Sequence, residues 1–397
     1  MFFSKKIINS NMPLNRNLTE DQILIRDTIR SFAETNIRKQ SKILDEKEEF
    51  SYEITSQMSE LGLLGAFLPS KYGGAELDYV SYIIAVEELA RVDSSQAATI
   101  AAHNSLGTGP IYYFGNDEQK EKYLPQLSSG KLWGFGLTEP EAGSDAGNTQ
   151  TTAVQDGDYW IINGSKIFIT NSATDITIGS TILAITGERK GGGKELSCFL
   201  VENDTPGFSQ HEMKDKMMWR GSNTGELVLE NVRVHKSAML GNQGEGFKQM
   251  LSTLDRGRLS IAAMGLGLAQ GAFELALKYS KERITFGKPI SQYQANAFKL
   301  ADVEMGIELA RTYLYDVCKM QDEGLNITKE GAIAKLNCSE LAHTAANHCV
   351  QIHGGYGLMK EYDAEKYYRD QKLLEIGEGT SEIQRLVIAR SIGCFDS

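Results

Sequence analysis

The chain has 397 residues, of which 41% are hydrophobic and 23% are charged, and its formal net charge is -11. This length and composition are typical of a globular protein with two or three domains. The acidic balance argues against nucleic acid as a partner, although local basic groups could still bind an anionic ligand.

The first residues, 1–17, carry Lys5, Lys6 and Arg16 and contain no acidic residue. They could form a short matrix-targeting segment, a frayed tail, or an overextended start before Met12. No apolar run reaches the ~18–20 residues of a membrane span. We expect a cytoplasmic protein, with the mitochondrial matrix as the alternative.

Residues 18–130 are expected to form a helical N-terminal domain. The sequence Thr19-Glu-Asp-Gln22 is a capping-box pattern, and Ile25, Ile29 and Phe32 follow at helical spacing. Further helical patterns cover residues 51–67 and 80–92.

Residues 131–240 are expected to form a central β domain, as a small sandwich or barrel. Asp156-Gly157 and Asn163-Gly164 are hairpin turn signals, and β-branched and aromatic residues surround the second one. Residues 181–186, 197–201 and 226–234 are predicted strands, and the glycine-rich segment 187–196 is a predicted hairpin tip.

Residues 241–397 are expected to form a C-terminal four-helix bundle, with helices over about 249–284, 290–324, 327–355 and 381–392. Gly265, Gly267 and Gly271 lack the spacing and the strand-to-helix context of a dinucleotide fingerprint. We expect them to let helices approach closely. The fold class is therefore α+β, with helical domains on either side of a β domain.

The cysteines do not indicate a disulfide framework or a metal site. None belongs to a C-x-x-C pair, and their number is odd, which favours reduced thiols. His343 and His348 are five residues apart and do not share a helix face. We therefore expect no bound metal.

Several loops could bind a ligand, and each also has a simple structural explanation. The glycine-rich stretch 134–148 could offer backbone donors to a phosphate or a polar ring edge, or could be an ordinary interdomain loop. Phe168 could pack against a cofactor ring or in the core. Asp255-Arg256-Gly257-Arg258 is expected to open a long helix, where two arginines oppose the helix dipole.

The stretch 373–390 contains three glutamates, Glu375, Glu378 and Glu382. Glu378 lies between Gly377 and Gly379, just before a predicted helix capped in the segment Ser381 to Gln384. Flanking glycines leave its carboxylate open to a flat ligand. Ile383, Leu386 and Val387 are expected to form the buried stripe of that helix.

The chain as a whole resembles the acyl-CoA dehydrogenase family over essentially its full length. The resemblance rests on motifs that match in order and spacing: GLTEPEAGSDAG, IFITN, RGSNTGELVLENVRV, DRGRLSIAA, RITFGKPISQYQ, QIHGGYG and EGTSEIQR. It implies FAD as cofactor, an acyl-CoA substrate, an electron-transfer flavoprotein as partner, and a homotetramer built from dimers.

The resemblance also implies roles for individual residues, with Glu378 as the catalytic base. The flavin-binding residues of the same subunit would be Phe135, Leu137, Thr138, Gly143, Ser144, Phe168, Ile169, Thr170, Thr380, Ser381 and Glu382. The residues that reach the FAD of a neighbouring subunit would be Arg283, Thr285, Phe286, Tyr293, Gln294, Gln351, Ile352, His353, Gly354 and Gly355. Substrate contacts would come from Ser144, Asp255, Arg256, Gly257, Arg258, Gly379 and Arg390. Phe168 stands where many members have tryptophan.

The implied reaction is α,β-dehydrogenation of a fatty acyl-CoA to the trans-2-enoyl-CoA. Residues 97–115 resemble the short-chain members, which favours butyryl-like substrates, with medium-length or branched chains left open. The stretch from Val92 to Gln119 contains no lysine or arginine, so a substrate with a second carboxylate is not expected. Alternatives are an oxidase that uses oxygen and a catalytically silent flavin- or CoA-binding scaffold.

Overall fold

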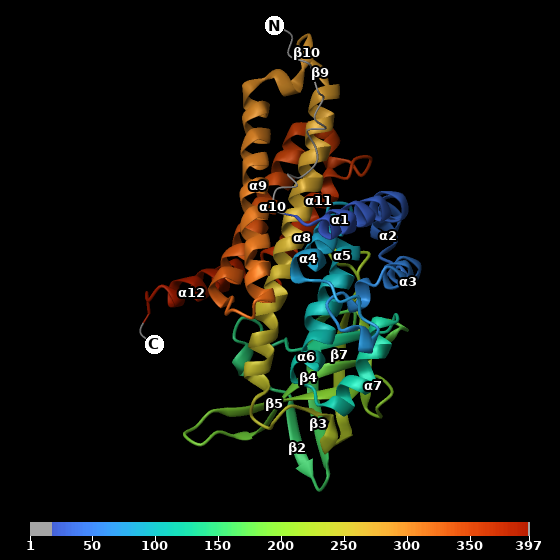
Figure 1. Ribbon diagram of the computed structural model, residues 1–397, viewed down its shortest axis with the longest axis vertical. Coiled ribbons are helices and arrows are strands. Elements are labelled where there is room, and N and C mark those ends of the chain that lie inside the picture. Colours follow the sequence, from blue (N-terminus) through green and yellow to red (C-terminus); the bar gives the residue numbers. More distant parts are fainter. Residues whose placement is uncertain (1–17, 396–397) are drawn as a thin grey trace.

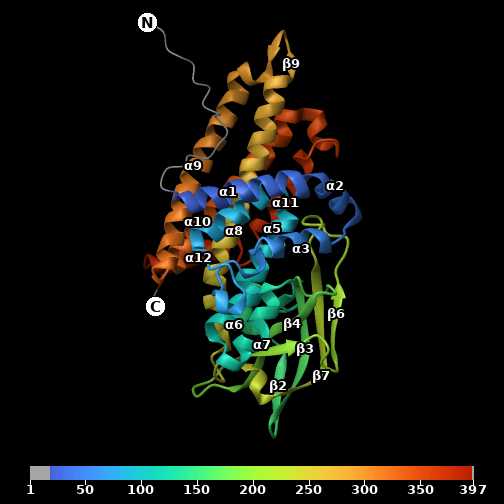
Figure 2. The same cartoon turned by 45° about the vertical axis from the view of Figure 1, so that its right-hand side comes forward.

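The computed structural model describes residues 18–395, so the expectations for residues 1–17 lie outside it. The molecule is elongated (Figure 1). The β-sheet lies at one end of the long axis, and the long C-terminal helices extend to the other end. A 45° turn shows the N-terminal helices against the side of these long helices (Figure 2).

The N-terminal part is helical, as predicted. Thr19 caps the first helix in a capping box: its Oγ1 accepts from the Gln22 N–H at 3.2 Å, and Gln22 Oε1 accepts from the Thr19 N–H at 3.0 Å. The helices are α1 (Glu20–Phe32), α2 (Arg38–Lys47), α3 (Tyr52–Glu60), α4 (Tyr79–Ala90), α5 (Ser94–Ala102), α6 (Gly109–Phe114) and α7 (Asp117–Ser128).

The central part is an eight-stranded sheet in the order β6-β7-β3-β2-β4-β5-β8, with β1 paired in parallel to β4. Its strands are β1 (Leu132–Gly136), β2 (Thr152–Asp156), β3 (Tyr159–Thr170), β4 (Thr177–Glu188), β5 (Lys194–Glu202), β6 (Phe208–Glu212), β7 (Thr224–His235) and β8 (Met239–Leu240). The Asp156-Gly157 hairpin and the glycine-rich tip between β4 and β5 are confirmed.

The hairpin turn predicted at Asn163-Gly164 is wrong. Both residues lie inside β3, which pairs with β7 on both sides of them. The register shifts there as a β-bulge, and Gly164 has φ 149°. A Cβ at Gly164 would lie 2.4 Å from Thr151 Oγ1, so glycine is required by close packing and not by a turn.

The C-terminal part contains the predicted long helices and one more. Its elements are α8 (Gly246–Glu282), the hairpin strands β9 (Ile284–Thr285) and β10 (Lys288–Pro289), α9 (Gln294–Asp322), α10 (Thr328–His353), α11 (Ala364–Leu374) and α12 (Ser381–Ser391). Helix α11 was not predicted. Among the described residues, α8 alone has the length and apolar composition of a membrane span, but 89% of that window is buried, as in the core helix of a bundle.

Two details of helix capping differ from the predictions. Helix α8 begins at Gly246, so Asp255 to Arg258 lie in its interior and do not open it. The cap of α12 is Thr380, whose Oγ1 accepts from the Ile383 N–H at 3.2 Å. The expected stripe on α12 is half-buried, since its buried residues are Ser381 and Gln384.

The α8 glycines act as predicted, by letting neighbouring backbones approach. An added Cβ would lie 2.7 Å from the Cys338 carbonyl oxygen at Gly265, 2.1 Å from the Glu87 oxygen at Gly267 and 2.1 Å from the Arg91 oxygen at Gly271. The described cysteines are all free. The fold class is confirmed, while the domain boundaries near residues 130 and 240 stay predictions.

Replacing Gly267 by alanine should therefore destabilise the protein, although alanine favours a helix by about 1 kcal/mol. The new Cβ would meet the α4 backbone, and overpacking of this kind costs about 1–3 kcal/mol. Gly331→Ala on α10 is the matched control, because its Cβ would meet nothing closer than 3.4 Å. We expect thermal unfolding to show a lower Tm for Gly267→Ala only. Equal Tm values for both variants would contradict the close-packing explanation.

Candidate active site

Glu378 lies in the short connection between α11 and α12, against the bare backbone of α8. Its φ of 53° and the φ of 94° at Gly379 place both residues in the left-handed region, which is strained for glutamate. A Cβ at Gly257 would lie 2.0 Å from Glu378 Oε2. A side chain at position 257 would therefore displace the carboxylate from this position.

One oxygen of the Glu378 carboxylate is withdrawn from water, although the residue as a whole is half-buried. Its Oε2 is buried and, among the described residues, has no hydrogen-bond partner. Burial raises the pKa of Glu378 to about 7, and the positive charges of Lys335 and Arg258 oppose this rise. Such a group is a proton acceptor near neutral pH and is not engaged by another side chain.

The other two glutamates of this stretch have surroundings that differ from those of Glu378. Glu375 Oε2 pairs with Lys372 Nζ at 2.5 Å, and its Oε1 lies 3.2 Å from His343 Nδ1. Glu382 is exposed in the first turn of α12, where hydrogen bonds to its own backbone N–H and to Thr380 lower its pKa. Glu375 is half-buried like Glu378, but its carboxylate is held in an ion pair, whereas Glu378 Oε2 has no partner among the described residues.

The predicted substrate-binding residues of α8 flank Gly257. Arg258 Nη1 donates to Asp255 Oδ1 at 2.6 Å, and Asp255 Oδ2 accepts from Thr328 Oγ1 at 2.8 Å. The Arg256 guanidinium lies 4.0 Å from the centre of the Tyr113 ring. A cation from α8 therefore reaches the stretch 92–119, which has none of its own. Arg390 is exposed in the last turn of α12.

The predicted flavin loop, residues 134–148, meets the end of strand β3. The Thr138 carbonyl accepts from the Ile167 N–H at 2.9 Å, which places the loop beside Phe168. Phe168 is 63% exposed at φ 62°, whereas Ile169 is buried. Phe135 and Leu137 are buried, and Gly143 and Ser144 are exposed on the loop. An exposed aromatic ring beside open backbone suits a flat cofactor ring.

A buried ion pair behind this loop was missed by sequence reasoning. Lys166 Nζ donates to Glu139 Oε1 at 2.6 Å, and both side chains are almost fully buried. Glu139 also accepts from the backbone N–H groups of Gln150 and Thr151, at 2.6 and 3.2 Å. Strand alternation could have found Lys166, because it faces inward with Trp160 and Ile162.

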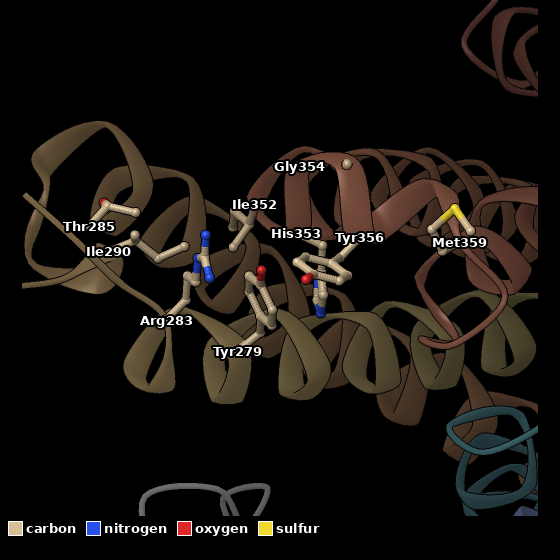
Figure 3. A pocket seen from close by; sticks show the side chains of 10 residues that line it. Tyr279, Arg283, Thr285, Ile290, Ile352, His353, Gly354, Tyr356 and Met359 are labelled. Atoms are coloured by element: carbon tan, nitrogen blue, oxygen red, sulfur yellow. The ribbon is translucent and has the colours of Figure 1, made fainter.

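The predicted residues for a neighbouring FAD gather at the far end of the bundle. A cavity of about 530 Å³ there is lined by Tyr279, Arg283, Thr285, Ile290, Ile352, His353, Gly354, Gly355, Tyr356 and Met359 (Figure 3). The Tyr279 and His353 rings stack at 4.2 Å. Tyr293 Oη donates to the Thr285 carbonyl at 2.8 Å. Gln294, which follows Tyr293, and Gln351, which precedes Ile352 of the cavity lining, are both exposed. Phe286 is 97% exposed.

The two groups of predicted cofactor residues lie at opposite ends of α8. Gly147 of the flavin loop lies near Phe247 at the start of α8, and Arg283 follows its last residue. A helix of 37 residues spans about 55 Å. Figure 1 shows the same separation, with the sheet and the β9–β10 hairpin at opposite ends. One dinucleotide cannot contact both groups of a single chain.

Comparisons with known proteins match all three parts of the chain to domains of one family. The N-terminal, middle and C-terminal domains of acyl-CoA dehydrogenase match residues 19–131, 134–232 and 244–393. The chain belongs to the acyl-CoA dehydrogenase family. A probable acyl-CoA dehydrogenase, YngJ of Bacillus subtilis, is 48% identical over 96% of this chain and 100% of its own length.

Solved structures of similar proteins share the fold. Butyryl-CoA dehydrogenase from Megasphaera elsdenii has a TM-score of 0.91 and 41% identity, covering 95% of this chain and 99% of its own. A structure from work on the electron transferring flavoprotein of Acidaminococcus fermentans and flavin-based electron bifurcation also has a TM-score of 0.91. It is 42% identical and covers 96% of this chain and 100% of its own.

The raised pKa of Glu378 generates a prediction about pH. If Glu378 must be ionised to accept a proton, kcat/KM for flavin reduction should increase with pH through a midpoint near 7, because this parameter reports the free enzyme. Stopped-flow reduction of the enzyme-bound flavin between pH 5.5 and 9 measures the midpoint. A rate that is already at its plateau at pH 5.5, as expected for a glutamate with the ordinary pKa of 4.5, would contradict the raised pKa.

Proposed function

We propose that the protein dehydrogenates a short-chain fatty acyl-CoA, such as butyryl-CoA, to the trans-2-enoyl-CoA, with Glu378 as the base. The observation that carries the proposal is the buried Oε2 of Glu378, which has no partner among the described residues and faces Gly257. Membership of the acyl-CoA dehydrogenase family supports the reaction. The butyryl-CoA dehydrogenase named above supports the substrate.

In this proposal the Glu378 carboxylate takes the α-proton of the thioester. FAD, when bound, would supply the two-electron acceptor for the β-hydrogen, and loss of the α-proton and the β-hydride together gives the Cα=Cβ double bond. The backbone N–H of Glu378 donates to no other described residue and is available to the thioester oxygen as negative charge develops on it. The left-handed turn presents both groups of Glu378, the acceptor and the donor, to one substrate.

The FAD site would be assembled from two subunits. The exposed Phe168, the open backbone at Gly143 and the loop beside them suit the flavin ring of one subunit. The cavity at Arg283 and His353 lies too far along α8 to serve the same FAD. A homotetramer built from dimers would bring the cavity of one subunit to the flavin of another.

The electron acceptor is proposed to be an electron-transfer flavoprotein, with support from the similar structure that comes from work on such a protein. The proposed location is the bacterial cytoplasm, since the relatives from Bacillus subtilis and Megasphaera elsdenii are bacterial. These relatives do not support the mitochondrial alternative. The expectation that substrates lack a second carboxylate stays a prediction.

The decisive experiment is Glu378→Gln. The amide keeps the size of the side chain but cannot accept the proton, so turnover of butyryl-CoA should fall by roughly 10²–10⁴-fold. FAD content and acyl-CoA binding should remain. Reduction of a dye, with and without oxygen, across a panel of chain lengths measures the loss and identifies an oxidase.

The matched controls are Glu375→Gln and Glu382→Gln, which remove carboxylates from the same stretch and should retain appreciable activity. If the Glu378→Gln enzyme reduced its flavin at a near wild-type rate with every chain length, the assignment of Glu378 as the base would be wrong.

The shared FAD site predicts that Arg283→Ala weakens FAD retention without unfolding the chain. Arg283 lines the cavity, and its side chain is exposed. Gel filtration with flavin absorbance should show FAD loss from the variant. Lys281→Ala, on the same exposed helix end, is the control and should keep FAD. A monomeric wild type that holds FAD tightly would overturn the two-subunit site.

A further inference from the structure

Lys335 on α10 is buried in an unusual way. Its side chain is fully buried, and its Nζ donates to the Gly379 carbonyl at 2.8 Å. Among residues 18–395, no carboxylate lies within ion-pair distance of this ammonium. Lysine is rarely buried unless it is paired. The position of Lys335 therefore needs an explanation beyond helix packing.

The carbonyl that Lys335 contacts belongs to the residue directly after the proposed base. Gln384 of α12 donates to the same carbonyl at 2.9 Å and to the Glu378 carbonyl at 3.2 Å. Because Glu378 adopts a left-handed backbone angle, the turn is strained at this residue and depends on such contacts. Lys335 of α10 and Gln384 of α12 thus both donate to the backbone of this turn and hold it in place.

We propose that Lys335 is a positioning residue for the base: its ammonium holds the Glu378–Gly379 turn and its charge favours the ionised carboxylate. The inference rests on the proposed function, because it takes Glu378 as the base.

The charged and titratable groups that face Glu378 come from three helices. Lys335 lies on α10, Arg258 on α8 and Tyr82 on α4. Within the segment of Glu378 itself, Glu375 and Glu382 act on Lys335 and help to keep it protonated. Lys335 is the larger of the two cationic influences on the pKa of Glu378.

The two cations differ in how far their charge is compensated. Arg258 is held by Asp255 at 2.6 Å, so much of its field is cancelled locally. Burial lowers the pKa of Lys335 to about 8, and this lysine remains mostly protonated at pH 7. Its uncompensated charge is therefore available to the neighbouring carboxylate.

The test uses the FAD holoenzyme and the variant Lys335→Met, which has a similar length but neither charge nor donor. Loss of a nearby cation should raise the midpoint of kcat/KM against pH by about one unit. At pH 7 the ionised fraction of Glu378 would then fall about fivefold. Infrared titration of the Glu378 carboxyl band, assigned by its absence in Glu378→Gln, should show the same shift without turnover.

Further variants separate charge from position. Lys335→Gln keeps a donor for the Gly379 carbonyl and should show the midpoint shift with a smaller loss of limiting rate. If Lys335→Met does not fold, Lys335→Gln provides the same test of the midpoint. Lys335→Arg keeps the charge and should restore a midpoint close to wild type. Gln384→Met removes the uncharged donor to the same carbonyl, and should lower the limiting rate without moving the midpoint.

Wild-type midpoints in Lys335→Met or Lys335→Gln would overturn the inference. The same shift in Gln384→Met would also overturn it, since a structural disturbance would then explain the effect. Failure of the proposed function has a different signature: a wild type that does not act on acyl-CoAs, or an active Glu378→Gln. An active wild type and an inactive Glu378→Gln with unshifted Lys335 variants would reject this inference alone.

Discussion

The contact between the Glu378 carboxylate and the bare backbone of Gly257 is the constraint on which the site depends. Any side chain at position 257 would occupy the space of the carboxylate oxygen. The contact also excludes water from one side of that oxygen, and the resulting loss of solvation is the main cause of the raised pKa of Glu378. The packing of the Glu378 loop on α8 and the raised pKa of Glu378 therefore have the same cause.

The same helix sets the geometry of the cofactor site. Helix α8 begins beside the loop 134–148, passes Glu378 at Gly257 and ends at Glu282, next to Arg283 of the cavity. Its glycines allow the α4 and α10 backbones to approach closely, and most of its apolar window is buried. Its ends are about 55 Å apart, and this separation is the geometric basis of the proposed site shared between subunits.

Local sequence patterns were sufficient to predict most helices and strands. They failed where contacts between distant parts of the chain determine the local structure. The Thr19 capping box and the Asp156-Gly157 hairpin depend on neighbouring residues alone, and both are confirmed. Asn163-Gly164 has the local pattern of a turn, but its glycine is required by the close approach of Thr151, the residue before β2. The resemblance suggested Glu378, whereas its burial, its partner Gly257 and the support from Lys335 required three-dimensional contacts. Lys335 nevertheless lies on the stripe of Gly331, Cys338 and Ala342, and a lysine at that spacing is a usable signal.

Two buried lysines support the two loops of the candidate site, and the difference between them matters. Lys166 donates to the Leu137 carbonyl at 3.3 Å, and its charge is paired with that of Glu139. Lys166 therefore holds the flavin loop in place without adding an unpaired charge to the site. Lys335 donates to the Gly379 carbonyl without a carboxylate at ion-pair distance among the described residues. Burial of an uncompensated charge costs stability. A fold that only needed to hold the turn could use an uncharged donor, as it already does with Gln384. The charge on Lys335 is therefore best explained by its action on the carboxylate beside it.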